Sequence, residues 1–200
     1  MSTTQTTNAI EYREDVLKEL VLYVGSKCWR DEHYCVLKLN KILFYSDFHA
    51  FKVRGKPITG AEYKKYPHGP APAAMKRVRE ELEDNEEAFE YKIPLPSFNE
   101  DGEQFVEKRF LAIRAAKLDA FLTAEEIAIV DDVIEALRPL TGAEVSRRSH
   151  QHPGWRLAKM NETIPYATAL LPDQPDTLGA ADLTWATDVA DKFGAGSIRK

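Results

Sequence analysis

The chain has 200 residues, of which 44% are hydrophobic and 30% charged, and its formal net charge at pH 7 is −5. This length suits one domain, and no apolar run approaches the ~18–20 residues that a membrane-spanning helix needs. The acidic balance disfavours nucleic acid as a partner, because phosphate binding normally requires a basic surface.

The N-terminus and the cysteines indicate the compartment. Residues 1–15 lack the basic and then apolar pattern of a secretory signal. Cys28 and Cys35 are too few for a disulfide scaffold, and free cysteines are typical of a reducing compartment. We therefore expect a cytoplasmic protein that does not enter the membrane.

A first helix is expected from about residue 9 to residue 27, after a frayed tail over residues 1–8. Asn8 and Glu11 have the spacing of an N-terminal capping box, which favours a helix that starts directly after Asn8. The polar run over residues 28–34 has no helical period, and it predicts a connection to the next helix.

The stretch 36–54 is expected to be the central helix, because it is apolar on nearly every side. Gly55 and Pro57 should end it, since glycine accepts a positive φ after the last turn and proline cannot continue a helix. Asp47 lies within this apolar stretch and needs hydrogen-bond donors if it is buried. We expect Asp47 to tie the helix to the segment 61–70.

The segment after this helix has a constrained backbone. Residues 61–66 are expected to be extended, and Tyr66-Pro67-His68-Gly69-Pro70 places two prolines around a glycine before a third helix over about 73–85. Two interpretations of His68 stay open. Its imidazole is either presented at a recognition surface or is simply part of a tight turn.

A β-hairpin is predicted next. Apolar and charged side chains alternate from Phe89 to Leu95, which is the period of a half-buried strand. Residues 99–102 have turn chemistry, and 104–114 can return as the partner strand. With the extended run 61–66, this predicts a small antiparallel sheet of about three strands.

The C-terminal half is predicted to be helical. Thr123 with Glu126, and Thr141 with Glu144, form two further capping boxes. We also expect one or two helical turns over about 164–170 and a last amphipathic helix from about 182 to 193. The expected fold class is therefore α+β, predominantly helical, with about six helices around the small sheet.

The sequence contains no motif that assigns a catalytic residue, cofactor or metal. His150 and His152 lie two residues apart but lack further ligands at zinc-site spacing, so a histidine that caps a helix end is the preferred interpretation. Cys28 and Cys35 are interpreted as small core residues rather than nucleophiles. The familiar phosphate-binding, dinucleotide-binding and hydrolase motifs are absent from the sequence.

Several motifs resemble the Panacea domain, the SocA-like antitoxin domain of bacterial and phage toxin–antitoxin systems. They are KLNKILFYSDF, GKPITGAEY, PHGPAP, LTAEEIAIVDDVIEALRPLTGAEVSRRSHQHPGW and IPYATALL, and they occur in the family's order over roughly residues 17–171. The resemblance implies a single Panacea-like domain over residues 1–200, with a C-terminal helical extension over about 172–200.

The resemblance also implies a function. Members of this family look like antitoxins that neutralise a cognate protein toxin by direct binding, so we expect a protein–protein interaction and not an enzyme. Candidate partner-binding residues on the motif segments are Tyr63, Tyr66, His68 and Trp155. Self-association is left open.

Two alternatives are kept. The first is a small-molecule enzyme with a polar pocket that gathers Asp47, Tyr66 and His68. The second is a phage-related regulatory protein that binds nucleic acid or delivers a partner to a protease.

Overall fold

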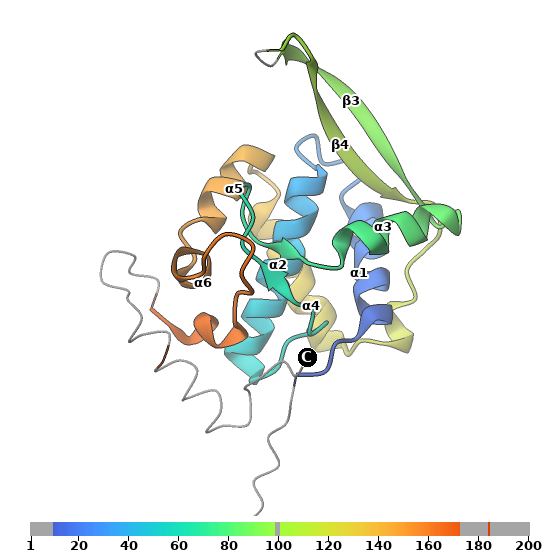
Figure 1. Cartoon of the computed structure of the whole chain (residues 1–200). Coiled ribbons are helices and arrows are strands. Elements are labelled where there is room, and N and C mark those ends of the chain that lie inside the picture. The colour runs from blue at the N-terminus through green and yellow to red at the C-terminus, as the bar shows by residue number, and fades with distance from the viewer. Residues whose placement is uncertain (1–9, 99–100, 173–183, 185–200) are drawn as a thin grey trace, which may run out of the picture.

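The computed structural model describes residues 10–98, 101–172 and 184 (Figure 1). The described α-helices are α1 (Glu14–Lys27), α2 (Val36–Arg54), α3 (Met75–Asp84), α4 (Ala124–Leu137), α5 (Gly142–Ser149) and α6 (Pro153–Leu157). The strands are β1 (Tyr63–Lys64), β2 (Ala71–Pro72), β3 (Ala88–Phe98) and β4 (Gln104–Ala112), and two short 3-10 helices are η1 (Leu118–Ala120) and η2 (Tyr166–Leu170). The helix-dominated α+β class is confirmed. Within the described residues, no helix is long and apolar enough to cross a bilayer.

Helix α2 is central, as predicted, and other elements surround it (Figure 1). It contacts α1, α4, α5, η2 and β2. Its aromatic side chains pack with those of later segments: the ring centres of Phe48 and Tyr166 lie 4.8 Å apart, and those of Phe44 and Tyr63 lie 5.5 Å apart. Gly55 ends the helix with a φ of 73°, which is the left-handed conformation expected for this residue.

The predicted start of the first helix is wrong. Helix α1 begins at Glu14, and residues 10–13 are not helical; Asn8 lies outside the described residues. The Arg13 backbone N–H donates a hydrogen bond to the Thr59 carbonyl at 2.7 Å. This long-range pairing holds the segment against the chain that follows α2, so the local capping pattern does not decide where the helix starts.

The later helix boundaries follow the sequence. The Thr123 hydroxyl accepts a hydrogen bond from the Glu126 backbone, and the Glu126 carboxylate accepts one in return from Thr123. The same reciprocal capping box opens α5 at Thr141 and Glu144. Apart from residue 184, which is helical, the helix predicted over about 182–193 lies outside the described residues.

The predicted three-stranded sheet is two separate sheets. Strand β1 pairs with β2, with Tyr63 opposite Pro72 and Lys64 opposite Ala71. Strand β3 pairs with β4 in the second sheet. The extended run 61–66 therefore closes onto the chain just after the PHGP turn, because this partner is only a few residues away in sequence.

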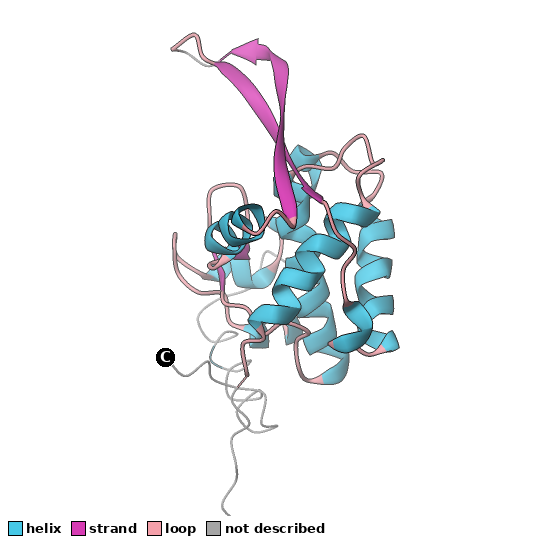
Figure 2. Cartoon of the chain, turned by 90° about the vertical axis from the view of Figure 1, so that its right-hand side faces the viewer, coloured by secondary structure: helices cyan, strands magenta, loops and turns pink. Residues whose placement is uncertain are grey.

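The β3–β4 hairpin projects away from the helical body (Figures 1 and 2). Ala88 and Phe110, at its base, are buried. Phe89 and Tyr91, on the other face, are 44% and 53% exposed, so the prediction of a half-buried strand is wrong for these two side chains. Alternation identifies an apolar side of a strand, but it does not show whether another element of the chain covers it.

Candidate interaction surface

A buried hydrogen-bond network beneath the surface fixes the chain that leads to the PHGP turn. The Asp47 carboxylate is 1% exposed and accepts hydrogen bonds from the backbone N–H groups of Ile58, at 2.8 Å, and Thr59, at 2.7 Å. It also accepts from the Thr59 hydroxyl and, at 2.9 Å, from the Tyr63 phenol. The expected structural role of Asp47 is thus confirmed, with its backbone donors slightly upstream of residues 61–70.

Burial dominates the electrostatics of this network. It raises the pKa of the Asp47 carboxyl, although the hydrogen bonds from Thr59, Tyr63 and Ile58 act in the opposite direction. Burial, followed by the negative charge of Asp47, also raises the pKa of the Tyr63 phenol well above its usual value. The Tyr63 phenol therefore remains protonated and serves as a donor that holds β1 to α2.

The PHGP turn is clamped between α2 and α5. The Gly69 N–H donates to the Tyr66 carbonyl at 2.9 Å, and the Ser146 hydroxyl donates to the His68 carbonyl at 2.8 Å. Gly69 has a φ of 95°, and a Cβ at this position would lie 2.2 Å from the Ser149 hydroxyl oxygen and 2.6 Å from Cε of Lys41. The turn requires glycine for its conformation and for the close packing beneath it.

Trp155 connects α6 to the same turn. Its indole stacks on the His150 imidazole, with ring centres 4.0 Å apart and planes 11° apart. The Trp155 indole N–H donates to the Tyr66 carbonyl at 3.3 Å, and Nζ of Lys65 lies 4.0 Å from the Trp155 ring centre. A residue with these three contacts has little rotamer freedom left to lose on binding a partner.

Three of the four predicted partner-binding residues meet here. Tyr66 and Trp155 are half-buried, and His68 is exposed. We name the group formed by Lys65, Tyr66, Pro67, His68, His150 and Trp155 the turn surface. Tyr63 is only 1% exposed, so the structure places it under this surface, where it positions the turn from below.

Sequence reasoning missed the buried amine of Lys41 under the turn. Lys41 is 1% exposed, and burial lowers its pKa to about 8. Burial also lowers the pKa of His150, and the nearby charges of Lys41 and His68 act in the same direction. No carboxylate among the described residues pairs with Lys41. The only feature of the sequence that could have indicated this burial is the position of Lys41 on an apolar helix.

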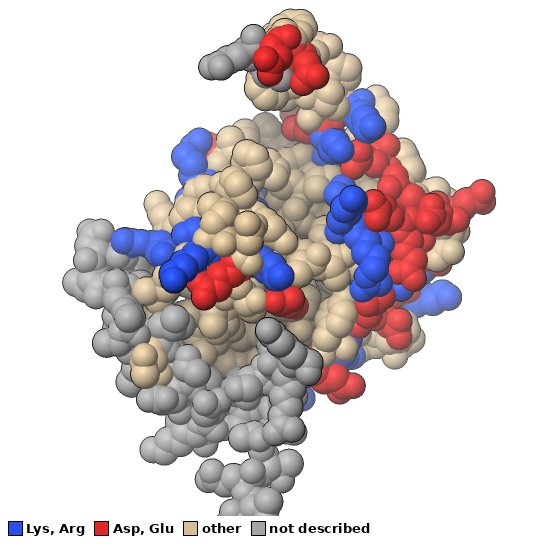
Figure 3. All heavy atoms as spheres, viewed as in Figure 1, with Lys and Arg blue, Asp and Glu red and all other residues tan. Residues whose placement is uncertain are grey.

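The basic side chains of α3 form ion pairs. Arg77 pairs with Glu14 at 2.5 Å, and Arg79 pairs with Glu90 at 3.0 Å. Basic and acidic side chains lie next to each other on the α3 side of the molecule (Figure 3). Such paired groups offer little attraction to phosphate, so the α3 face is a poor surface for nucleic acid.

The enzyme and metal alternatives find no assembled site in the described residues. Asp47 is buried with Tyr63, whereas Tyr66 and His68 lie at the surface. No group of three or more potential metal ligands occurs in the part of the chain that the structure describes. The Nδ1 atom of His152 accepts a hydrogen bond from the Gly154 N–H at 3.1 Å and caps α6, as the preferred interpretation of these histidines proposes.

Comparison with known protein families gives a match. The model of the family described as "Antitoxin SocA-like, Panacea domain" matches residues 39–156, which is more than half of the chain. The matched region contains the turn surface and most of α2. No curated protein and no solved structure matches the chain.

Proposed function

The chain belongs to the antitoxin SocA-like Panacea family, and we propose that it is an antitoxin that neutralises a cognate protein toxin by direct binding. The family match carries the proposal, because it covers the segments that build the turn surface. The proposal includes a cytoplasmic site of action and inhibition by occlusion of the toxin, without turnover of a substrate.

The turn surface has the properties of a binding surface for a protein. A stable complex needs an interface of roughly 1,200–2,000 Å² in which a few aromatic or similar anchors contribute most of the affinity. Trp155 and Tyr66 supply aromatic area, and His68 supplies an exposed imidazole on a clamped backbone. We propose that these three residues contact the toxin and that Tyr63 positions them.

Co-expression with the open reading frame next to this gene tests the proposal. The neighbouring product alone should arrest growth, and co-expression of this chain should restore growth and yield a complex that co-purifies. The proposal fails if growth stays arrested and no complex forms although both proteins are produced in soluble form.

A substitution at the turn surface localises the effect. His68→Ala should weaken the complex by about tenfold or more, and it should leave the melting temperature unchanged because the side chain is exposed. The matched control is His33→Ala, since His33 is also exposed but lies in the loop between α1 and α2. Equal affinities for both variants would place the contact elsewhere.

A further inference from the structure

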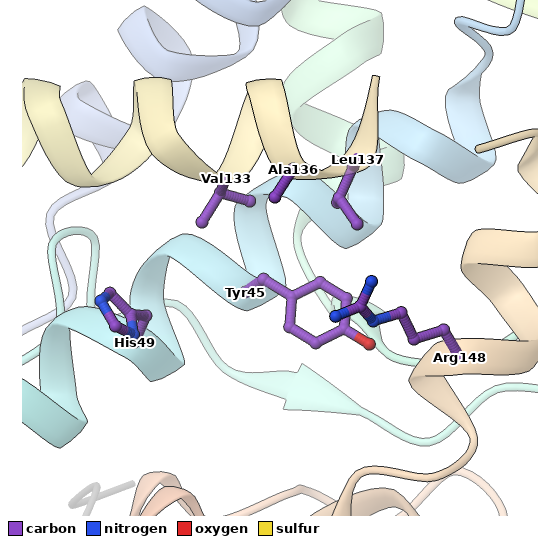
Figure 4. A pocket seen from close by; sticks show the side chains of 6 residues that line it. All are labelled: Tyr45, His49, Val133, Ala136, Leu137 and Arg148. Carbon is purple, nitrogen blue, oxygen red and sulfur yellow. The ribbon is translucent and has the colours of Figure 1, made fainter. Parts of the chain in front are cut away.

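A pocket lies between α2 and α4, next to α5. Its volume is about 160 Å³, and its lining residues are Tyr45, His49, Val133, Ala136, Leu137 and Arg148 (Figure 4). We name these six residues the α2–α4 pocket. Neither the turn surface nor the Asp47 network includes any of them.

The pocket is apolar on one side and has polar groups on the other. Val133, Ala136 and Leu137 project from α4, whereas Tyr45 and His49 come from successive turns of α2 (Figure 4). The Arg148 side chain extends from α5 toward the Tyr45 ring (Figure 4), and both residues line the pocket. A cavity of about 150 Å³ can hold a benzene-sized group, so this pocket has room for one apolar side chain.

The charges at the pocket indicate the chemistry of its occupant. Arg148 and His49 are exposed, and none of the described residues that line the pocket carries a carboxylate. Among the described residues, Arg54 pairs with Glu126 and Arg138 pairs with Glu135, whereas no carboxylate pairs with Arg148. An arginine at the mouth of an apolar pocket offers a planar pair of donors that fits a carboxylate.

We propose that the α2–α4 pocket receives one apolar side chain of the bound toxin, and that a carboxylate next to that side chain pairs with Arg148. This inference rests on the proposed function and deepens it by naming a second contact and its chemistry. The occupant is a segment of the partner protein with an apolar residue beside an acidic one.

The position of α5 favours the same partner for both surfaces. This helix supplies Arg148 to the pocket, and it supplies Ser146 and Ser149 to the underside of the PHGP turn. Its eight residues span only about 12 Å. One interface of ordinary size can therefore cover the pocket and the turn surface together.

Two pairs of variants test the pocket in the complex. Ala136→Phe fills it from an exposed helical position, and Arg148→Glu reverses the charge at its mouth. The matched controls are Ala128→Phe, at an exposed position earlier on α4, and Arg147→Glu, at the exposed neighbour of Arg148. Each pocket variant should weaken toxin binding by at least about tenfold, and each control by less than about twofold. If the wild-type chain binds the toxin and the pocket variants bind it equally well, the inference is overturned while the proposed function stands.

A fragment titration tests the pocket without any toxin. The probe is 4-methylpentanoate, which joins a leucine-like group to a carboxylate, and 3-methylbutylamine is the counterpart with a positive charge. In ¹⁵N-correlated NMR spectra of the whole chain, the carboxylate should shift the amides around His49, Val133 and Arg148, and Ala136→Phe should abolish the shifts. Equal shifts with the amine, persistence of the shifts in Ala136→Phe, or no shifts at these amides would each overturn the inference. This titration remains decisive even if the neighbouring gene product proves not to be a toxin.

Discussion

Gly69 shows how one residue holds the proposed binding surface in place. Gly69→Ala should lower the free energy of unfolding by about 2–4 kcal/mol, because the new methyl group meets Ser149 and Lys41 at a φ of 95°. Gly55→Ala is the matched control, since Gly55 also has a positive φ but no atom within 4 Å of an added Cβ. It should cost only about 1 kcal/mol. Chemical denaturation of both variants checks the difference, and equal losses would show that crowding under the turn is unimportant.

Lys41 gives the fold a defined pH dependence. Its pKa is about 8 in the folded protein and 10.5 as the ordinary value, so the fold disfavours the charged amine. The buried charge of Lys41 therefore lowers the free energy of unfolding by its full amount below pH 8. This loss decreases between pH 8 and 10.5 and vanishes above pH 10.5. Lys41→Met should therefore raise the free energy of unfolding at pH 7 by about 1–3 kcal/mol, with a smaller gain at pH 10.

Denaturation at the two pH values measures this gain. Lys56→Met serves as the control, because Lys56 is exposed. The account of Lys41 would be contradicted if its replacement gave no gain at pH 7, or the same gain at pH 10.

For single residues, the sequence predicted which side chains require hydrogen-bond partners better than it predicted which side chains are buried. A carboxylate on an apolar helix must find donors, so the structural role of Asp47 could be predicted from its neighbours in sequence. The burial of Tyr63 could not, because the partners of its phenol and ring lie on α2 and η2, far away along the chain. Lys41 was missed for the same reason, since its environment is created by the turn at Gly69.

Among the elements, the β3–β4 hairpin is joined to the body mainly at its base. Phe110 is buried there, and the Arg109 guanidinium donates to the carbonyls of Asp31 and Glu32. Lys92 lies directly opposite Lys108, so residues 93–107 can be replaced by an Asn-Gly turn that joins the two lysines. The free energy of unfolding should change by less than about 1 kcal/mol, because an isolated outer hairpin is only marginally stable.

The control for the shortened hairpin is Phe110→Ala, which removes a fully buried ring and should cost about 3–5 kcal/mol. Thermal and chemical denaturation compare the two variants. A loss on shortening as large as the loss for Phe110→Ala would mean that the outer hairpin is part of the stable core.

Element boundaries were predictable where local hydrogen bonds decide them. The capping boxes at Thr123 and Thr141 form as their spacing indicates. A similar pattern at Asn8 and Glu11 failed, because Arg13 pairs with Thr59 and α1 starts only at Glu14. The alternation of apolar and charged residues also predicted the hairpin correctly. It could not predict that the hairpin projects from the body, because this depends on whether other elements of the chain cover its faces.

For the whole molecule, composition and helical periods were sufficient for the α+β class and for the central place of α2. The division into two sheets was not predicted, because the two-residue strand β2 is too short to show a strand period in the sequence. The assembly of the turn surface was not predictable either. The sequence singled out His68 and Trp155, but their approach to one another requires α5 and α6 to fold back onto the turn.

Hydrogen–deuterium exchange of the free chain and of its complex with the neighbouring gene product tests the central claim most directly. If the chain neutralises a toxin by covering it with the turn surface, backbone amides in residues 64–69 and 150–157 should exchange more slowly in the complex. Amides on α3 should exchange at the same rate in both states. A stable complex in which 64–69 and 150–157 keep their free exchange rates, while α3 becomes protected, would contradict the account.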